Sequence, residues 1–213
     1  MAITLDPQDA TDAYVIGAGG HAKVMIQCLQ SMGRRVVGVF DDDLAKQGRL
    51  VAGVPVLGTT AEIRRFHRRP AVIAIGNNRI RHQLAAQIDL PWLTAIHPHA
   101  YVDPTARLGP GTMVGAGVVI QCDAQLGAHV IVNTSATVDH DCQIGDCVHL
   151  CPGVHLPGDV TIDTGATMGT GAVCIPSVHI GAWTMVGAGS VVTRNLPEHV
   201  TAAGIPARVI RRP

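Results

Sequence analysis

The second half of the chain repeats with a period of six residues. Residues 102–197 divide into sixteen consecutive hexads without one insertion, and the first position of every hexad is apolar. At this composition, chance would give such a register in roughly three cases per hundred thousand. A hexapeptide period is typical of a parallel β-helix, in which three hexads form one triangular coil and each coil hydrogen-bonds to the next. The repeat therefore predicts a prism of about five coils.

The hexad positions also predict which side chains fill the prism. First positions spaced by eighteen residues should stack inside as ladders, for example Val132, Leu150, Met168 and Val186. A β-sandwich of short strands is the alternative, but its strands would not keep a period of six across their turns. Residues 198–213, EHVTAAGIPARVIRRP, leave the repeat. We expect them to cap the open end of the prism and to shield its strand edges.

The first ninety residues alternate between strand-like and helix-like segments. Strands are predicted at 13–17, 35–43, 54–58 and 71–78, and helical patterns at 23–33, 59–69 and 79–88. This alternation predicts a parallel sheet with helical crossovers, and such sheets bind ligands at the carboxyl ends of their strands.

A glycine-rich loop follows the first predicted strand. Residues 17–22, GAGGHA, match the pattern G-x-G-x-x-A, and Asp41 follows about twenty residues later, as in a dinucleotide fingerprint. Glycines let backbone N–H groups approach a phosphate at the start of a helix. A tight turn without a ligand is the alternative interpretation. Because about ninety residues supply only one mononucleotide-binding half, a nucleotide or nucleotide sugar is favoured over NAD.

Composition excludes several classes of function. Sixteen basic side chains balance sixteen acidic ones, and 47% of the residues are apolar, which argues against disorder and against nucleic-acid binding. No apolar run reaches the roughly 18 residues of a membrane span, and the start does not resemble a secretion signal, so we expect a cytoplasmic protein without membrane contact. In that compartment the six cysteines are expected to be free thiols.

Several motifs carry a resemblance to a known family. They are GAGGHA at 17–22, Asp41-Asp42, Gly76-Asn77, VNTSATVDHDCQIGDCVHLCPG within the hexads, and the closing GAGSVVTRNLPEHVTAAGIPAR. With these motifs the chain resembles, over nearly its whole length, the bacterial sugar acyltransferases that join a small Rossmann-like α/β domain to a left-handed β-helix. That family includes sialic acid O-acetyltransferases and N-acetyltransferases for nucleotide-linked 4-amino-4,6-dideoxyhexoses, such as GDP-perosamine.

The resemblance implies a fold, an activity and partners. Residues 1–95 would form the nucleotide-sugar-binding domain, and residues 96–213 the left-handed β-helix with its C-terminal cap. The implied enzyme is a homotrimer without a metal, which transfers an acetyl group from acetyl-CoA to the 4-amino group of a GDP- or UDP-linked sugar for surface polysaccharide or glycan synthesis. Acetyl-CoA, the co-substrate, would lie in the groove between neighbouring prisms.

The resemblance also assigns roles to residues. His140 falls on the general base and Asp141 on the acid beside it. The implied substrate-binding residues are Gly17, Gly19, Gly20, His21, Asp41, Asp42, Gly76, Asn77 and Asn133. Those implied for acetyl-CoA are His149 near the thioester, then Gly169, Thr170, Gly187, Ala188, Gly204, Ile205, Pro206 and Arg208.

The residues themselves favour the same chemistry at His140. An amine that attacks a thioester must lose a proton, and an imidazole titrates near the working pH. His140 occupies the third hexad position, at a corner where side chains point outward, next to an acid. A solvated corner residue is the alternative interpretation.

Four alternatives to an N-acetyltransferase with direct transfer stay open at this point. The first is a sugar O-acetyltransferase of the sialic acid type. Another is a γ-type zinc carbonic anhydrase, although His149 and His155 should lie on different faces of the prism and cannot share a pocket within one chain. A third is a ping-pong mechanism through an acyl-cysteine at Cys147 or Cys151. The last is a nucleotide-sugar sensor without catalysis, which the presence of His140 disfavours.

Overall fold

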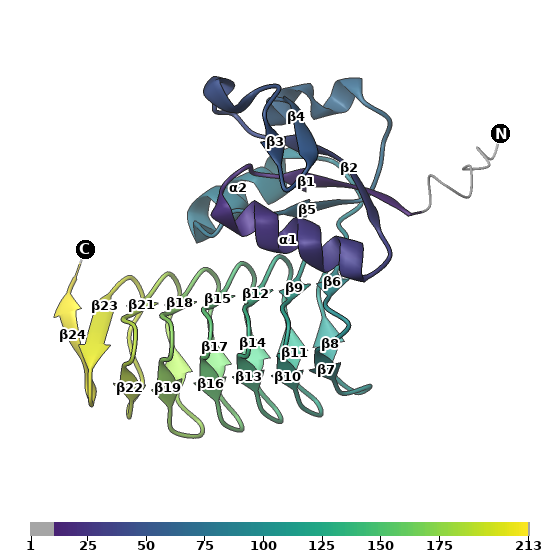
Figure 1. Ribbon diagram of the computed structural model, residues 1–213. Coiled ribbons are helices and arrows are strands. Elements are labelled where there is room, and N and C mark those ends of the chain that lie inside the picture. Colours follow the sequence, from purple (N-terminus) through teal and green to yellow (C-terminus); the bar gives the residue numbers. More distant parts are fainter. Residues whose placement is uncertain (1–10, 213) are drawn as a thin grey trace.

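A computed structural model describes residues 11–212; the first ten residues of the predicted N-terminal domain and Pro213 lie outside the described residues. The N-terminal part alternates strands and helices as predicted, and its sheet has the order β3-β4-β2-β1-β5 (Figure 1). Four of these strands run parallel, which confirms the predicted parallel sheet. The main elements are β1 (Asp12–Ile16), α1 (Gly20–Ser31), β2 (Arg35–Phe40), β4 (Val54–Gly58), β5 (Ala71–Ile73) and α2 (Asn78–Gln87).

The predicted helix at 59–69 is wrong in type and length. The chain forms the 3-10 helix η2 (Thr60–Arg65), whose start is fixed because Glu62 accepts hydrogen bonds from the backbone N–H and hydroxyl of Thr59. Phe66 is extended, and its ring packs edge-on against Phe40 at 5.1 Å, so the helix ends there. Two further elements were not predicted from the sequence: η1 (Leu44–Lys46) and β3 (Leu50–Val51), which pairs antiparallel with β4.

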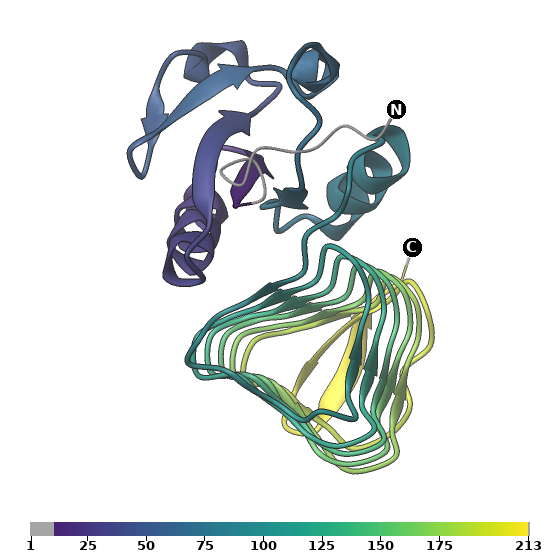
Figure 2. The same cartoon turned by 90° about the vertical axis from the view of Figure 1, so that its right-hand side faces the viewer.

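The C-terminal part is a triangular prism of three parallel sheets, as predicted (Figure 2). The first face contains β6 (Ala95–Ile96), β9 (Met113–Val114), β12 (Ile131–Val132), β15 (His149–Leu150), β18 (Thr167–Met168), β21 (Met185–Val186), β23 (Thr201–Gly204) and β24 (Ala207–Arg211). The second face contains β7 (Tyr101–Val102), β10 (Val119–Ile120), β13 (Thr137–Val138), β16 (His155–Leu156), β19 (Val173–Cys174) and β22 (Val191–Val192). The third face contains β8 (Arg107–Leu108), β11 (Gln125–Leu126), β14 (Gln143–Ile144), β17 (Thr161–Ile162) and β20 (His179–Ile180).

The ladders inside the prism are those that the hexads predict. Val132 pairs with Leu150, Leu150 with Met168, and Met168 with Val186, and all four side chains are buried. A corner of the prism follows each strand. We call them the first corner (between the first and second faces), the second corner (between the second and third) and the third corner (between the third and first).

The corners have a backbone feature that the sequence analysis did not predict. The fourth position of every hexad from the second to the fifteenth has a positive φ, where the chain turns. Six of these residues are glycine, which adopts this conformation readily, and eight are not. Asp141 is one of the eight, with a φ of 61°.

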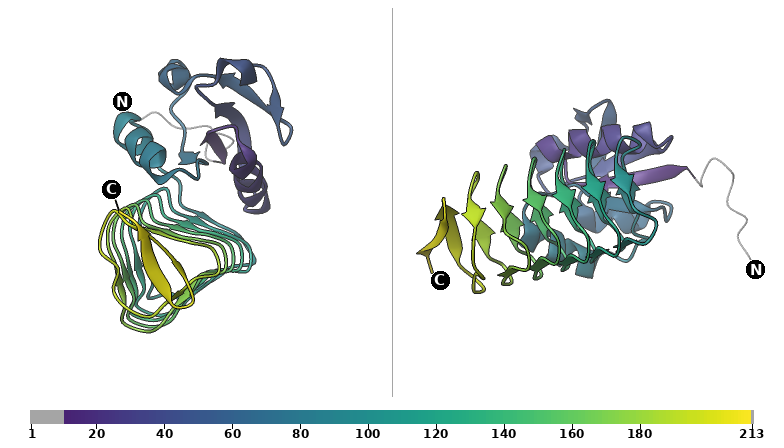
Figure 3. Two further views of the ribbon diagram at one scale, coloured as in Figure 1. Left: turned by 90° about the vertical axis from the view of Figure 1, so that its left-hand side faces the viewer. Right: turned by 90° about the horizontal axis from the view of Figure 1, so that it is seen from below.

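The N-terminal part packs on the first face of the prism. The side chains of Met113 and Ile131 point outward from this face, and both are buried in one cluster with Ala22, Met25 and Ile26 of α1. Figure 3 shows both parts from the opposite end of the prism and from below. The predicted division after residue 95 falls within β6, which pairs with β9 of the prism.

The C-terminal segment extends the first face. β23 pairs parallel with β21, and β24 returns antiparallel beside it. Ala202 and Ala207 are buried in the prism core, so the segment covers its open end, as predicted. None of the helices within residues 11–212 has the length and apolarity that a bilayer span requires.

Candidate functional site

The glycine loop between β1 and α1 forms an open cradle. Gly17 has a φ of +101°, and a Cβ there would lie 3.1 Å from the carbonyl oxygen of Ala74, so only glycine fits. Around Gly19 and Gly20, by contrast, a Cβ would meet no atom within 4 Å. α1 begins at Gly20, without an acidic residue in its first turn. The start of this helix is therefore uncrowded, and the N-terminal N–H groups of a helix are suited to bind a phosphate.

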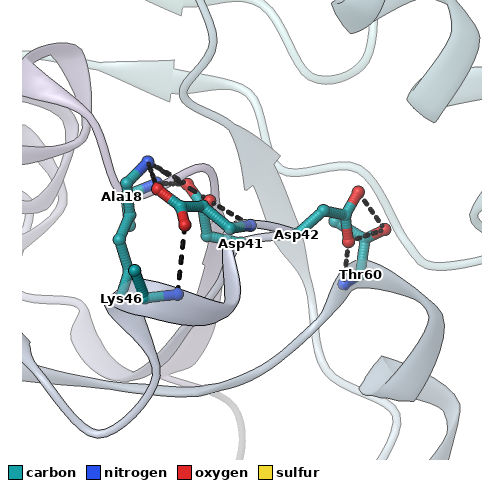
Figure 4. Close-up of polar contacts among 7 residues, drawn as sticks. Ala18, Asp41, Asp42, Lys46 and Thr60 are labelled. Atoms are coloured by element: carbon teal, nitrogen blue, oxygen red, sulfur yellow. Dashed lines mark hydrogen bonds and ion pairs between the residues drawn. The ribbon is translucent and has the colours of Figure 1, made fainter.

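Asp41 and Asp42 hold this end of the sheet together (Figure 4). The Asp41 carboxylate accepts hydrogen bonds from the backbone N–H of Ala18 (2.6 Å) and Asp43 (2.9 Å) and from Nζ of Lys46 (3.1 Å). Burial raises the pKa of Asp41, but these hydrogen bonds and the Lys46 charge bring it below its ordinary value. Asp42 accepts from the backbone N–H and the hydroxyl of Thr60, both at 2.8 Å. Both carboxylates thus brace the predicted nucleotide site.

The predicted residues Gly76 and Asn77 lie after β5, beside the glycine loop. The side-chain oxygen of Asn77 caps α2, because it accepts hydrogen bonds from the backbone N–H of Arg79 (3.0 Å) and Ile80 (3.1 Å). Asn77 therefore has a structural role as the N-cap of α2.

Gly76 meets the prism at a junction of polar side chains. Nε2 of His149 lies 3.3 Å from Nδ2 of Asn133, and the ring lies beside Gly76, where a Cβ would be 3.8 Å from its Cε1. The His21 ring lies 6.3 Å from that of His149. Burial, then the charge of Arg81, lowers the pKa of His149 to about 4 and also lowers that of His21. The structure thus brings the predicted substrate residues Gly76 and His21 close to the junction with Asn133 of the prism, and it places His149 among them.

Two residues of this junction were missed by the sequence analysis. Arg81 of α2 is only 1% exposed and donates to the backbone carbonyls of His129 and Cys147 in the third corner. Asn78 donates to the carbonyls of Gly165 and Ala166, one coil further along. Both residues lie in the polar stretch NRIRHQ. The sequence of this stretch does not distinguish a side chain that packs against the prism from one that is exposed to solvent.

The predicted base lies on the second corner. Nδ1 of His140 is 2.8 Å from Oδ2 of Asp141, and both side chains are more than half exposed. Asp141 is thus close enough to orient the ring, although it is a short acid. The hydrogen bond to Asp141 raises the pKa of His140. This arrangement leaves Nε2 as the ring nitrogen that can take a proton from a substrate.

Within one chain, His140 is far from the nucleotide loop. The second corner is the vertex opposite the first face, and the first face is the one that the N-terminal part covers (Figure 2). A ligand held by Gly19 and Gly76 would therefore lie on the side of the prism that faces away from His140 of the same chain.

The residues predicted for acetyl-CoA form a column along the first corner. Gly169 and Thr170 follow β18, and Gly187 and Ala188 follow β21. Gly204 is the last residue of β23, and Ile205 and Pro206 follow it. Ile205 is 77% exposed at the end of this column. Packing also favours glycine at positions 169 and 187. A Cβ at Gly169 would lie 2.5 Å from the backbone nitrogen of Ala188, and one at Gly187 would lie 2.9 Å from the Cβ of Ala203.

The structure separates the C-terminal arginines. Ala203 pairs with Arg208 near the turn of the β23–β24 hairpin, next to the column, whereas Thr201 pairs with Arg211 at the other end of the hairpin. Arg211 and Arg212 line a small hollow with Trp183 and Met185 at the third-corner side. Of the three arginines, only Arg208 is adjacent to the predicted acetyl-CoA groove.

Cysteine and metal chemistry have little basis in the described residues. Burial raises the pKa of both Cys147 and Cys151, which disfavours a thiolate nucleophile. His149 and His155 lie on the first and second faces, as the hexads predict. Within residues 11–212, no three His, Cys, Asp or Glu side chains are grouped to hold a metal ion.

Comparison with known proteins identifies the family. Residues 12–88 match the PglD N-terminal domain. The chain is 32% identical over 212 residues to the GDP-perosamine N-acetyltransferase of Escherichia coli O157:H7, covering 93% of this chain and 96% of that protein. PerB from Caulobacter crescentus, solved with CoA and GDP-perosamine, is 43% identical with a TM-score of 0.88, covering 93% of this chain and 96% of PerB.

A third relative is the acetyltransferase domain of PglB from Neisseria gonorrhoeae FA1090, solved in complex with acetyl coenzyme A. It is 39% identical with a TM-score of 0.87, and the match covers 94% of this chain and 99% of that domain. These matches confirm the family resemblance and the Rossmann-like and left-handed β-helix folds, and they decide against a carbonic anhydrase. Because the similarity extends along nearly the full length of these relatives, the chain belongs to the family of PglD-like acetyltransferases, together with the GDP-perosamine N-acetyltransferases.

Proposed function

We propose that this protein transfers the acetyl group of acetyl-CoA to the 4-amino group of a nucleotide-linked 4-amino-4,6-dideoxyhexose, with GDP-perosamine as the first candidate. The observation that carries this proposal is the exposed His140–Asp141 pair in a chain that is 43% identical to PerB, which was solved with CoA and GDP-perosamine. The product would enter surface polysaccharide or glycan synthesis. We propose a cytoplasmic location because acetyl-CoA and nucleotide sugars are cytoplasmic compounds.

The proposed reaction is a direct transfer. The sugar nitrogen attacks the thioester carbonyl carbon, Nε2 of His140 takes the proton that the nitrogen loses, and the carbon–sulfur bond breaks. The CoA sulfur leaves and receives a proton, so the products are the acetamido sugar and CoA. Asp141 fixes the tautomer in which Nδ1 carries the hydrogen, and it stabilises the imidazolium that forms.

We propose that residues 1–95 hold the nucleotide sugar through the glycine loop and Gly76, and that residues 96–213 hold acetyl-CoA along the first corner. Because His140 lies on the corner opposite the N-terminal part, the base must come from a neighbouring copy. A closed ring of three copies satisfies this requirement with three equal sites. The proposed enzyme is therefore a homotrimer with shared active sites.

Subunit complementation tests the shared site. His140→Asn removes the base, and Gly19→Leu fills the phosphate cradle, where the structure has room for the new side chain. Mixed trimers assembled from equal amounts of the two inactive variants should recover about one quarter of wild-type activity, since one neighbour pair in four combines both intact parts. No recovery in mixed trimers would place each site within one chain.

An acceptor screen tests the reaction class. CoA release should be seen with a 4-aminosugar nucleotide and not with the matching 4-hydroxy compound, and GDP- and UDP-linked acceptors should be compared at equal concentration. Turnover of the hydroxy sugar alone, or of sialic acid, would favour the O-acetyltransferase function instead. No CoA release with any amino sugar would overturn the proposal.

A further inference from the structure

Arg81 is a cation buried between α2 and the prism. It lies in the second turn of α2, 1% exposed, and no carboxylate among residues 11–212 forms an ion pair with it. Burial lowers the pKa of Arg81 to about 10, so its guanidinium is still charged at neutral pH. Burying a charge is unfavourable unless hydrogen bonds compensate it, and here backbone carbonyls do so.

The guanidinium joins three segments of the chain. Nη1 donates to the carbonyl of Ile75 at 2.8 Å, in the loop before α2. Nε donates to the carbonyl of His129 at 2.9 Å, and Nη2 to that of Cys147 at 2.8 Å, on two neighbouring coils of the prism. Nη2 also donates to the side-chain oxygen of Asn78 at 2.8 Å. One planar group thereby fixes the distance between the loop and the third corner.

These segments continue directly into the proposed acceptor site. Ile75 precedes Gly76, and Cys147 lies two residues before His149. The His149 ring lies beside Gly76, where a Cβ would be 3.8 Å from its Cε1, and its Nε2 lies 3.3 Å from Nδ2 of Asn133. A shift of the Ile75 carbonyl would therefore carry Gly76 away from His149.

We propose that Arg81 is a positioning residue for the acceptor: it holds the Gly76 loop against His149 and so sets how the nucleotide sugar is presented to the base. This inference rests on the proposed acetyltransferase function. It assigns to one buried side chain a role in recognition of the acceptor, distinct from the binding of acetyl-CoA along the first corner.

The geometry explains why arginine is needed. A lysine would keep the charge, but its single ammonium group cannot donate hydrogen bonds at the same time to the carbonyl of the loop and to the carbonyls of the prism.

Arg79 on the same helix offers a matched control. Its guanidinium lies over the Trp183 ring at 4.6 Å, so it also joins α2 to the prism, and among residues 11–212 no hydrogen bond links this guanidinium to the Gly76 loop.

The test compares Arg81→Lys and Arg81→Gln with Arg79→Gln. Both Arg81 variants should raise KM for the nucleotide sugar at least about tenfold while KM for acetyl-CoA stays within about twofold, because only the acceptor loop is displaced. Lysine should be the milder change. Arg79→Gln should leave both KM values within about twofold of wild type.

A spectroscopic readout accompanies the kinetics. In the Arg81 variants, the imidazole nitrogen signals of His149 should shift because Gly76 moves away from the ring, whereas Arg79→Gln should leave these signals unchanged. Unchanged His149 signals, or equal rises in both KM values, would overturn the inference. Loss of folded protein in both Arg81 variants would also overturn it, since Arg81 would then serve the fold alone. Wild-type protein that acetylates no amino sugar would instead overturn the proposed function.

Discussion

The imidazole of His140 occupies the space where a side chain of Gly158 would begin, one coil further along the same corner. An ideal Cβ at Gly158 would lie 2.5 Å from Nε2 of His140, the nitrogen assigned as the base. The φ of Gly158 is not positive, so alanine meets no backbone strain there. Gly158→Ala should therefore displace the ring and lower kcat at least about tenfold, since small misplacements of reacting groups are costly.

A double-mutant cycle checks this interpretation. Gly158→Ala in a His140→Asn background should cause little further loss, because the base that it displaces is already gone. A tenfold loss in both backgrounds would show that Gly158 acts independently of His140. The melting temperature of the single variant should stay close to that of wild type.

Removal of the base should affect rate and not folding. His140→Asn should lower kcat by at least about 10²-fold, the usual contribution of a general base. Because the His140 side chain is 55% exposed, the variant should keep the wild-type melting temperature and oligomeric state. Near-normal turnover in a folded variant would remove His140 from its assigned role.

The pH dependence of the reaction should report the His140–Asp141 hydrogen bond. A general base works in its neutral form, so kcat/KM should rise with pH through the pKa of His140. The hydrogen bond to Asp141 raises that pKa, and the rising limb should lie above the ordinary histidine value of about 6.5. Asp141→Asn should move the limb to lower pH, besides lowering the rate. A limb that stays in place would show that another group titrates.

Acid should destabilise the protein through its buried histidines. Burial lowers the pKa of His129 and of His149 to about 4, whereas the unfolded chain binds these protons near pH 6.5. The contribution of these two neutral histidines to the free energy of unfolding is therefore complete above pH 6.5. It is lost as the pH falls toward 4, by on the order of 3 kcal/mol for each histidine. His129→Asn, which suits the positive φ at this position, should reduce the fall in melting temperature between pH 7.5 and 5. An unchanged fall would assign the acid sensitivity elsewhere.

Substitutions at the two ends of the β23–β24 hairpin should have different effects on KM for acetyl-CoA. Arg208 lies beside the proposed groove, so Arg208→Ala should raise KM for acetyl-CoA about tenfold through the loss of a cation for its phosphates. Arg211→Ala at the other end is the matched control and should change this KM less than about twofold. Equal effects would contradict the position of the groove. Point variants are preferable to truncation after Ile205, because truncation would also remove the buried Ala207.

The hexad period made the prism predictable because it reflects a local constraint repeated in every coil. The first positions point inward in each coil, so the burial of Leu150 and Met168 follows from the sequence alone. The exposed corner residue His140 was predictable for the same reason, since its hexad position sets its direction. The acid Asp141 was found because it is the next residue.

Contacts between the two parts were not predictable in this way. Arg81 and Asn78 are polar residues on a helix, and only the docking of α2 onto the prism shows that they are buried. Asp41 was found by its spacing from the glycine loop, but its bonds to Ala18 and Lys46 depend on how the loops fold back. A signal was available at Met113 and Ile131, which are apolar at outward hexad positions of the face that the N-terminal part covers.

Those two outward side chains also limit how the protein can be recombined. Met113 and Ile131 belong to the prism in sequence, yet they complete the core beneath α1. In a chimera that combines a relative's N-terminal part with this prism, the relative's helix would pack against Met113 and Ile131, which are not its own partners. This holds even when the two parts are joined correctly near residue 95. We therefore expect that an exchange of nucleotide specificity between family members requires the first two coils of the prism to be exchanged as well.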